Sequence, residues 1–139
     1  MDKLDSPSSN SSFQRKKSTN SINLNTYNIL YTSFNQTNSH FCIGHEGGFQ
    51  IYKAYPFELK LDKYLNGGIG MVEVLYSTNI MALVGGGQYP KYSENRVIIW
   101  DEIQDGVICE IAFNYPIKAI KLNMEHIFII CEETTKRTK

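Results

Sequence analysis

The sequence has no excess charge of either sign and no long apolar run, and both absences restrict what the protein can be. Its 139 residues carry 14 basic and 14 acidic side chains, so the overall charge gives no support to a nucleic-acid partner. No apolar stretch reaches the length that spans a membrane, and the first residues contain no apolar core of a signal peptide. We therefore expect a cytosolic protein that does not bind nucleic acid.

Cysteine is also scarce. The three cysteines, Cys42, Cys109 and Cys131, are odd in number and widely spaced, which argues against a disulfide framework and against a zinc cluster. Each lies within an apolar stretch of strand length. We predict that all three are small core residues.

Groups that could carry catalysis are few and scattered. His40, His45 and His126 are far apart in the sequence, and the acidic residues beside them are Glu46 and Glu125. The sequence lacks a Gly-x-Ser-x-Gly motif, a Cys/His dyad motif and paired carboxylates with a clear task. These absences predict a protein that is not an enzyme and that has no metal site and no cofactor.

Two glycine-rich segments invite comparison with nucleotide-binding loops. Gly85-Gly86-Gly87 follows a strand-like run, as a dinucleotide-binding motif would. Such a site needs a helix directly after the loop, so that the N–H groups of its first turn face the phosphate. No helical pattern follows Gly87, and residues 67–70 also lead into a strand pattern. Both segments are therefore interpreted as tight turns.

The stretch from Asn66 to Asp101 contains the clearest strand signals. Residues 97–100 are large and apolar at every position, which is typical of a strand buried on both faces. In residues 107–113, one face carries Val107, Cys109, Ile111 and Phe113, and the other carries Ile108, Glu110 and Ala112. This amphipathic pattern predicts a strand further out in the same sheet. The strand-length segments in this part of the chain are bounded by turn residues and predict one antiparallel sheet, with strands near 71–76, 80–85, 96–101 and 107–113.

The same pattern recurs along the chain. A single four-stranded sheet cannot cover its own apolar faces, so copies that stack on it are expected. Phe41–Gly44 aligns with Ala82–Gly85 at a spacing near 40 residues, and Gly48–Tyr52 takes the place of Asn95–Trp100. A third copy begins at residues 117–122 and continues through 127–131. This period, with Trp100-Asp101 ending a strand, predicts an all-β fold of the WD40 β-propeller type, although the usual Gly-His pair is absent.

The repeats divide the chain into five parts. We expect a disordered Ser/Asn-rich tail at 1–26, blade 1 at 27–66, blade 2 at 67–114, part of blade 3 at 115–131 and a truncated polar tail at 132–139. At roughly 40–45 residues per blade, this amounts to about two and a half blades. We therefore expect an incomplete propeller.

A series of short motifs resembles the start of one propeller family. In order, they are FNQ from Phe34, GFQIY from Gly48, PFELK from Pro56, GGIGMVE from Gly67, NIMALVGGG from Asn79, PKY from Pro90 and VIIWD from Val97. This series is similar to that of the PROPPINs, the WIPI and Atg18-like propellers of autophagy. The resemblance covers roughly residues 27–131 and implies seven blades. It also implies binding to phosphatidylinositol 3-phosphate and 3,5-bisphosphate, and peripheral recruitment from the cytoplasm to preautophagosomal, endosomal or vacuolar membranes.

The resemblance also implies where the binding residues lie. The lipid sites of the family use two adjacent arginines, whose planar forks match phosphate oxygens. This chain has no Arg-Arg pair, and its arginines are Arg15, Arg96 and Arg137, so no lipid-binding residue is expected in it. Asn35 matches the asparagine of the family's Phe-Asn-Gln-Asp turn, whereas Thr37 stands where an acidic residue is usual. These two residues are the candidates for contact with an Atg2-like lipid-transfer protein. The alternative for Asn35 is a purely structural role, as a turn residue that caps its own backbone.

Two further functional hypotheses remain open. The chain could be a protein-interaction fragment that contacts an Atg2-like partner without binding lipid. It could also be a non-functional truncated product, because an open blade edge and an uncovered blade face favour aggregation.

Overall fold

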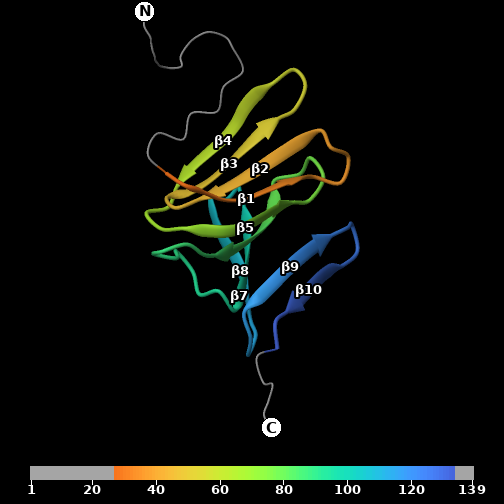
Figure 1. Ribbon diagram of the computed structural model, residues 1–139. Helices are drawn as coiled ribbons and strands as arrows, with labels where there is room; N and C mark the ends of the chain where they lie inside the picture. Colours follow the sequence, from red (N-terminus) through yellow and green to blue (C-terminus); the bar gives the residue numbers. More distant parts are fainter. Residues whose placement is uncertain (1–26, 134–139) are drawn as a thin grey trace, which may run out of the picture.

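Residues 27–133 are described by a computed structural model, and within this range the chain forms ten strands in three antiparallel sheets (Figure 1). The first sheet contains β1 (Ile29–Phe34), β2 (His40–His45), β3 (Gly48–Lys53) and β4 (Glu58–Tyr64). The second contains β5 (Ile69–Val74), β6 (Ile80–Gly85), β7 (Arg96–Asp101) and β8 (Gly106–Ala112). The third pairs β9 (Ile117–Leu122) with β10 (Ile127–Cys131).

The sheets follow one another as the blades of a propeller do. Strands pair in sequence order within each four-stranded sheet, and the first strand of each sheet lies beside the first strand of the next, β1 against β5 and β5 against β9. The three sheets are stacked in Figure 1. The predicted all-β, partial propeller fold is therefore confirmed.

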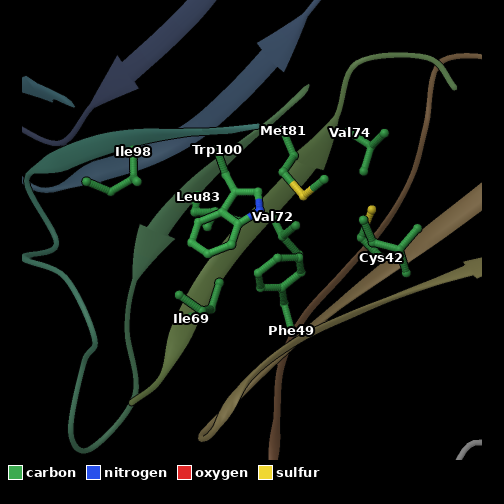
Figure 2. Packing of buried hydrophobic residues seen from close by; sticks show 10 residues of the cluster. Cys42, Phe49, Ile69, Val72, Val74, Met81, Leu83, Ile98 and Trp100 are labelled. Atoms are coloured by element: carbon green, nitrogen blue, oxygen red, sulfur yellow. The ribbon is translucent and has the colours of Figure 1, made fainter. Parts of the chain in front are cut away.

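The first and second sheets enclose the larger apolar core. Phe49 from β3 is fully buried, and its ring lies edge to face against Trp100 from β7, with ring centres 6.2 Å apart. Figure 2 shows the two rings meeting between the sheets, with aliphatic side chains around them. The buried members of this core are Cys42, Phe49, Ile51, Ile69, Val72, Val74, Met81, Leu83, Ile98 and Trp100.

A second core joins the second sheet to the third. Because successive side chains of a strand point to opposite faces, β6 and β7 supply both cores. The buried members of this second core are Ala82, Val84, Val97, Ile99, Ile117 and Ile120. The prediction that residues 97–100 form a strand buried on both faces is confirmed.

The repeat alignment needs a one-residue correction. Tyr31 pairs with Gly44 in the first sheet, and Met71 pairs with Val84 at the same place in the second. The structural equivalent of Gly44 is therefore Val84, whereas the sequence alignment matched Gly44 with Gly85. The alignment was wrong because it matched glycines, while the side-chain period of 2 decides which face each residue occupies.

Two further predictions differ from the structure. Cys42 is buried, but Cys109 is exposed and Cys131 is half-buried, so only one of the three cysteines is a full core residue. Cys109 is exposed because it lies on β8, the outer strand of its sheet. The first strand of the second sheet starts at Ile69 rather than Met71 and ends at Val74, because Tyr76 adopts a left-handed backbone angle (φ 51°) that a strand cannot contain.

The glycine-rich segments allow two pieces of backbone to approach closely. A side-chain carbon at Gly85 would lie 1.8 Å from the carbonyl oxygen of Tyr92, and one at Gly68 would lie 2.1 Å from that of Gly86. Gly68 donates its N–H to the Tyr89 carbonyl (2.8 Å) and accepts from the Lys91 N–H (2.9 Å). The polar loop after β6 is thus bonded to Gly68, directly before β5.

Candidate interaction site at the turn rim

Three turns meet at one end of the stacked sheets, and we call this end the turn rim. They are the β1–β2 turn (35–39), the β5–β6 turn (75–79) and the β9–β10 turn (123–126). Hydrogen bonds from Asn35 and Gln36 connect the first of these turns to Tyr76 in the second sheet and to Leu122 in the third. The turn rim is therefore a continuous surface built by all three sheets.

Asn35 organises the first of these turns. Its side chain is buried, and its Oδ1 accepts from the backbone N–H groups of Ser39 (2.9 Å) and His40 (3.1 Å). Its Nδ2 donates to Ser39 Oγ (3.0 Å) and to the Tyr76 carbonyl (3.1 Å). Asn35 therefore caps its own turn and also reaches the second sheet, while its contribution to partner binding stays a prediction.

Thr37 lies at the exposed tip of the same turn. Its hydroxyl is 2.9 Å from the hydroxyl of Ser39, and this hydrogen bond lies within the turn. The side chain faces solvent. Thr37 is thus placed where an external molecule can reach it, which Asn35 is not.

Gln36 is a member of the site that the sequence did not single out. Its Oε1 accepts from the Tyr76 N–H (2.7 Å), and its Nε2 donates to the Leu122 carbonyl (2.8 Å). One exposed side chain therefore bonds to the backbone of both other sheets. The only sequence signal was its position inside the FNQ motif, which does not reveal contacts 40 and 86 residues away.

A cleft of about 400 Å³ opens between the first and second sheets beside this rim. Its apolar lining comes from Ile51, Leu61, Val74 and Met81. Its polar lining comes from His40, Lys60, Tyr76, Ser77, Thr78, Asn79 and Glu102. An apolar floor with a polar margin is the usual character of a ligand or peptide site.

The charged side chains that line the cleft differ in how closely they are paired with opposite charges. Glu102 accepts from the indole N–H of Trp100 (3.0 Å) and forms an ion pair with Lys63 (3.2 Å), so its charge is compensated. Among residues 27–133, the one ion-pair partner of Lys60 is Glu58, at the long distance of 3.9 Å, and both side chains are about half exposed. Burial, together with the nearby charges of Lys53 and Lys60, lowers the pKa of His40. The lysine side of the cleft therefore favours an anionic group.

A polar cluster lies on the first strands of the sheets. Glu73 on β5 is buried and accepts a hydrogen bond from the Tyr31 hydroxyl on β1. Burial raises the pKa of Glu73, while the Tyr31 and Ser33 hydroxyls and the charge of Lys121 oppose that rise. Burial and the Glu73 charge raise the pKa of the Cys42 thiol to about 12. The cluster thus joins the first and second sheets through one titratable carboxyl group, with the charge of Lys121 on the third sheet nearby.

The histidines have separate surroundings. His45 stacks on Tyr27, and its Nδ1 accepts from the Gly47 N–H (3.0 Å); His126 lies in the β9–β10 turn beside Phe128. Across residues 27–133, no three side chains of the metal-binding types come together. The only arginine in this range, Arg96, is paired with Glu110 (3.0 Å).

Comparison with known proteins identifies the family. No family model matches the sequence. A Candida glabrata protein named SVP1-like protein 2 is 40% identical over 106 residues, which cover 72% of this chain and 24% of the relative. Autophagy-related protein 18 of the same yeast is 37% identical over 105 residues, which cover 76% of this chain and 21% of the relative. This chain belongs to the PROPPIN family.

Solved PROPPIN structures agree with the fold. Hsv2 from Kluyveromyces marxianus superimposes with a TM-score of 0.68 at 23% identity, over 77% of this chain and 33% of that protein. Kluyveromyces lactis Atg21, solved in a complex with the coiled coil of Atg16, gives a TM-score of 0.58 at 23% identity, over 74% of this chain and 33% of that one. This PROPPIN chain spans about a quarter of the length of the curated relatives it matches.

The described part of this PROPPIN chain also contains no helix that is long and apolar enough to cross a membrane.

Proposed function

We propose that this chain is the protein-binding portion of a PROPPIN scaffold in autophagy, with the lipid-binding portion encoded in blades that it does not contain. The observation that carries the proposal is the cleft beside the turn rim, which combines an apolar floor with weakly paired lysine charge. The family relationship, which covers about three quarters of the chain, supports the assignment to a PROPPIN scaffold.

The proposed organisation follows the three sheets. Blade 1 occupies residues 27–66, blade 2 residues 67–114 and part of blade 3 residues 115–131, with tails at 1–26 and 132–139. The intact protein would bind phosphatidylinositol 3-phosphate and 3,5-bisphosphate on preautophagosomal, endosomal or vacuolar membranes and recruit partners there. The tails lie outside, or largely outside, the residues that the structure describes.

The chain alone is expected not to bind phosphoinositide membranes. Two arginines side by side are the chemistry that the family resemblance assigns to headgroup binding, and Arg96 is already paired with Glu110. The measurement is liposome flotation of the 139-residue chain, with and without phosphatidylinositol 3-phosphate in the vesicles. Strong flotation that depends on the phosphoinositide would show that lipid-binding residues do lie in these blades.

The partner that fits the cleft best is an extended segment with an apolar side chain next to an acidic one. The apolar side chain would enter between Leu61 and Met81, and the acidic group would approach Lys60. Thr37, at the exposed tip of the neighbouring turn, would extend the contact along the turn rim. We propose an Atg2-like lipid-transfer protein as the source of this segment.

Charge reversal at the cleft tests this assignment. Lys60→Glu is expected to weaken binding of the chain to an immobilised fungal Atg2 protein by about tenfold, because it replaces attraction of an acidic group by repulsion. Lys118→Glu is the matched control, since Lys118 is similarly exposed and paired, but on β9 and away from the cleft. Equal binding by the wild type and Lys60→Glu would rule out the cleft as the contact.

A second candidate partner is a helical coiled coil, because a related propeller has been solved with one. Immobilised Atg16 coiled coil, used with the same two variants, separates the alternatives. Retention on Atg16 but not on Atg2 would favour the coiled coil.

A further inference from the structure

We infer that Asn35 and Gln36 are positioning residues, which hold the backbone of Tyr76 and so set the wall of the cleft. We call this pair the Asn35–Gln36 clamp. The inference deepens the proposed function and depends on it for the identity of the partner. The evidence for the clamp itself is the geometry around Tyr76.

Tyr76 has an unfavourable backbone conformation. Its φ is 51°, in the left-handed region that bulky residues seldom occupy. A non-glycine residue persists there only where its surroundings hold it. Tyr76 must therefore be held in place by specific contacts.

The clamp supplies those contacts on both sides of the residue. Gln36 Oε1 accepts from the Tyr76 N–H (2.7 Å), and Asn35 Nδ2 donates to the Tyr76 carbonyl (3.1 Å). Both backbone groups of Tyr76 are thus bonded to neighbouring side chains of another sheet. Within its own turn, Thr78 donates its N–H to the Leu75 carbonyl (3.0 Å), which bonds the turn around Tyr76 but not Tyr76 itself.

The position of Tyr76 matters for binding because its turn lines the cleft. Residues 76–79 form one wall, and His40, whose N–H is bonded to Asn35, lies on the opposite sheet. Gln36 also donates to Leu122 in the third sheet (2.8 Å), so the clamp fixes this wall against two neighbours at once. Loss of the clamp would let the turn move and would change the shape of the cleft without removing any residue that lines it.

The test measures the turn directly. Amide hydrogen exchange by NMR on the 139-residue chain is expected to show the Tyr76 amide exchanging about tenfold faster in Gln36→Ala than in the wild type, because its acceptor is lost. The Asp105 amide, bonded to Glu102 in a loop of the second sheet, should not change. Gln88→Ala, which alters an exposed glutamine after β6, is the matched control.

A conservative variant distinguishes the loss of the hydrogen bond to Tyr76 from the loss of side-chain volume. Gln36→Glu keeps an oxygen acceptor for the Tyr76 N–H but cannot donate to Leu122, so it should retain the slow exchange at Tyr76 that Gln36→Ala loses. Binding to immobilised fungal Atg2 should follow the same order, with Gln36→Glu stronger than Gln36→Ala.

Two results would overturn the inference. The first is unchanged exchange at Tyr76 in Gln36→Ala, and the second is faster exchange accompanied by wild-type affinity for Atg2. If the wild type itself does not bind Atg2, the proposed partner fails, while the exchange at Tyr76 still decides whether the clamp exists.

Discussion

Replacing Phe49 by alanine is expected to lower the free energy of unfolding by about 3–5 kcal/mol, the usual cost of removing a fully buried phenyl ring. Phe49 has no exposed surface and lies against Trp100 between the first and second sheets. Its removal would leave a cavity lined by side chains of two different sheets, which cannot collapse without shifting one sheet against the other. The effect should therefore appear as a loss of stability in both sheets together.

The chain contains its own probe for this measurement. Trp100 is the single tryptophan, so its fluorescence in urea reports on the interface that Phe49 fills. Phe34→Ala is the matched control, because Phe34 is 57% exposed on β1 and its loss creates no cavity in this core. If Phe49→Ala costs no more than Phe34→Ala, the two sheets do not share the core described here.

The parts of this fold that could be predicted from sequence are those set by local periodicity. The apolar residues 97–100 identified an inner strand, and the amphipathic pattern of residues 107–113 identified an outer one. Both assignments agree with the structure. The repeat of about 40 residues predicted stacked sheets because a single sheet cannot bury both of its faces. These inferences needed only the chain's own short-range pattern.

The register that relates one repeat to the next was harder to predict from the sequence. Gly44 and Gly85 look equivalent because each ends an apolar run, but strand pairing makes Val84 the counterpart of Gly44. A slip of one residue exchanges the two faces of a strand, and only the contact between sheets decides which face is inward. Cys109 was misjudged although its strand was predicted to lie further out, because an apolar residue on an outer strand need not be buried, and β8 is exposed along most of its length.

The candidate site depends on contacts between distant segments. Asn35 was identified through a family motif, whereas the role of Gln36 depends on a backbone angle at Tyr76, 40 residues away. The cleft depends on how the first two sheets pack, which no short sequence pattern encodes. Glu73 is an acidic residue within an apolar strand, and only the structure shows that it is buried against Tyr31.

Replacing Glu73 by glutamine is expected to raise the free energy of unfolding at neutral pH, because the buried site favours the neutral form of the side chain. Burial raises the pKa of Glu73 above its ordinary value of 4.5, so the folded protein binds this proton more tightly than the unfolded chain does. The stability from this group is therefore fully present below pH 4.5 and is lost as the pH rises through the folded-state pKa. Glutamine is neutral at every pH and can still accept from Tyr31, so this loss disappears.

Other titrating groups act in the opposite direction, and a comparison of the two proteins removes them. Burial lowers the pKa of His40 and of His45, so their contribution is lost as the pH falls. Because these groups are present in both proteins, the difference in unfolding free energy between Glu73→Gln and the wild type isolates Glu73. Urea unfolding from pH 4.5 to pH 8 should show this difference growing with pH, whereas Glu110→Gln, at an exposed ion pair, should change stability by less than about 1 kcal/mol throughout. A difference that does not vary with pH would mean that Glu73 is ionised normally in the folded protein, and that burial between the first and second sheets does not favour its neutral form.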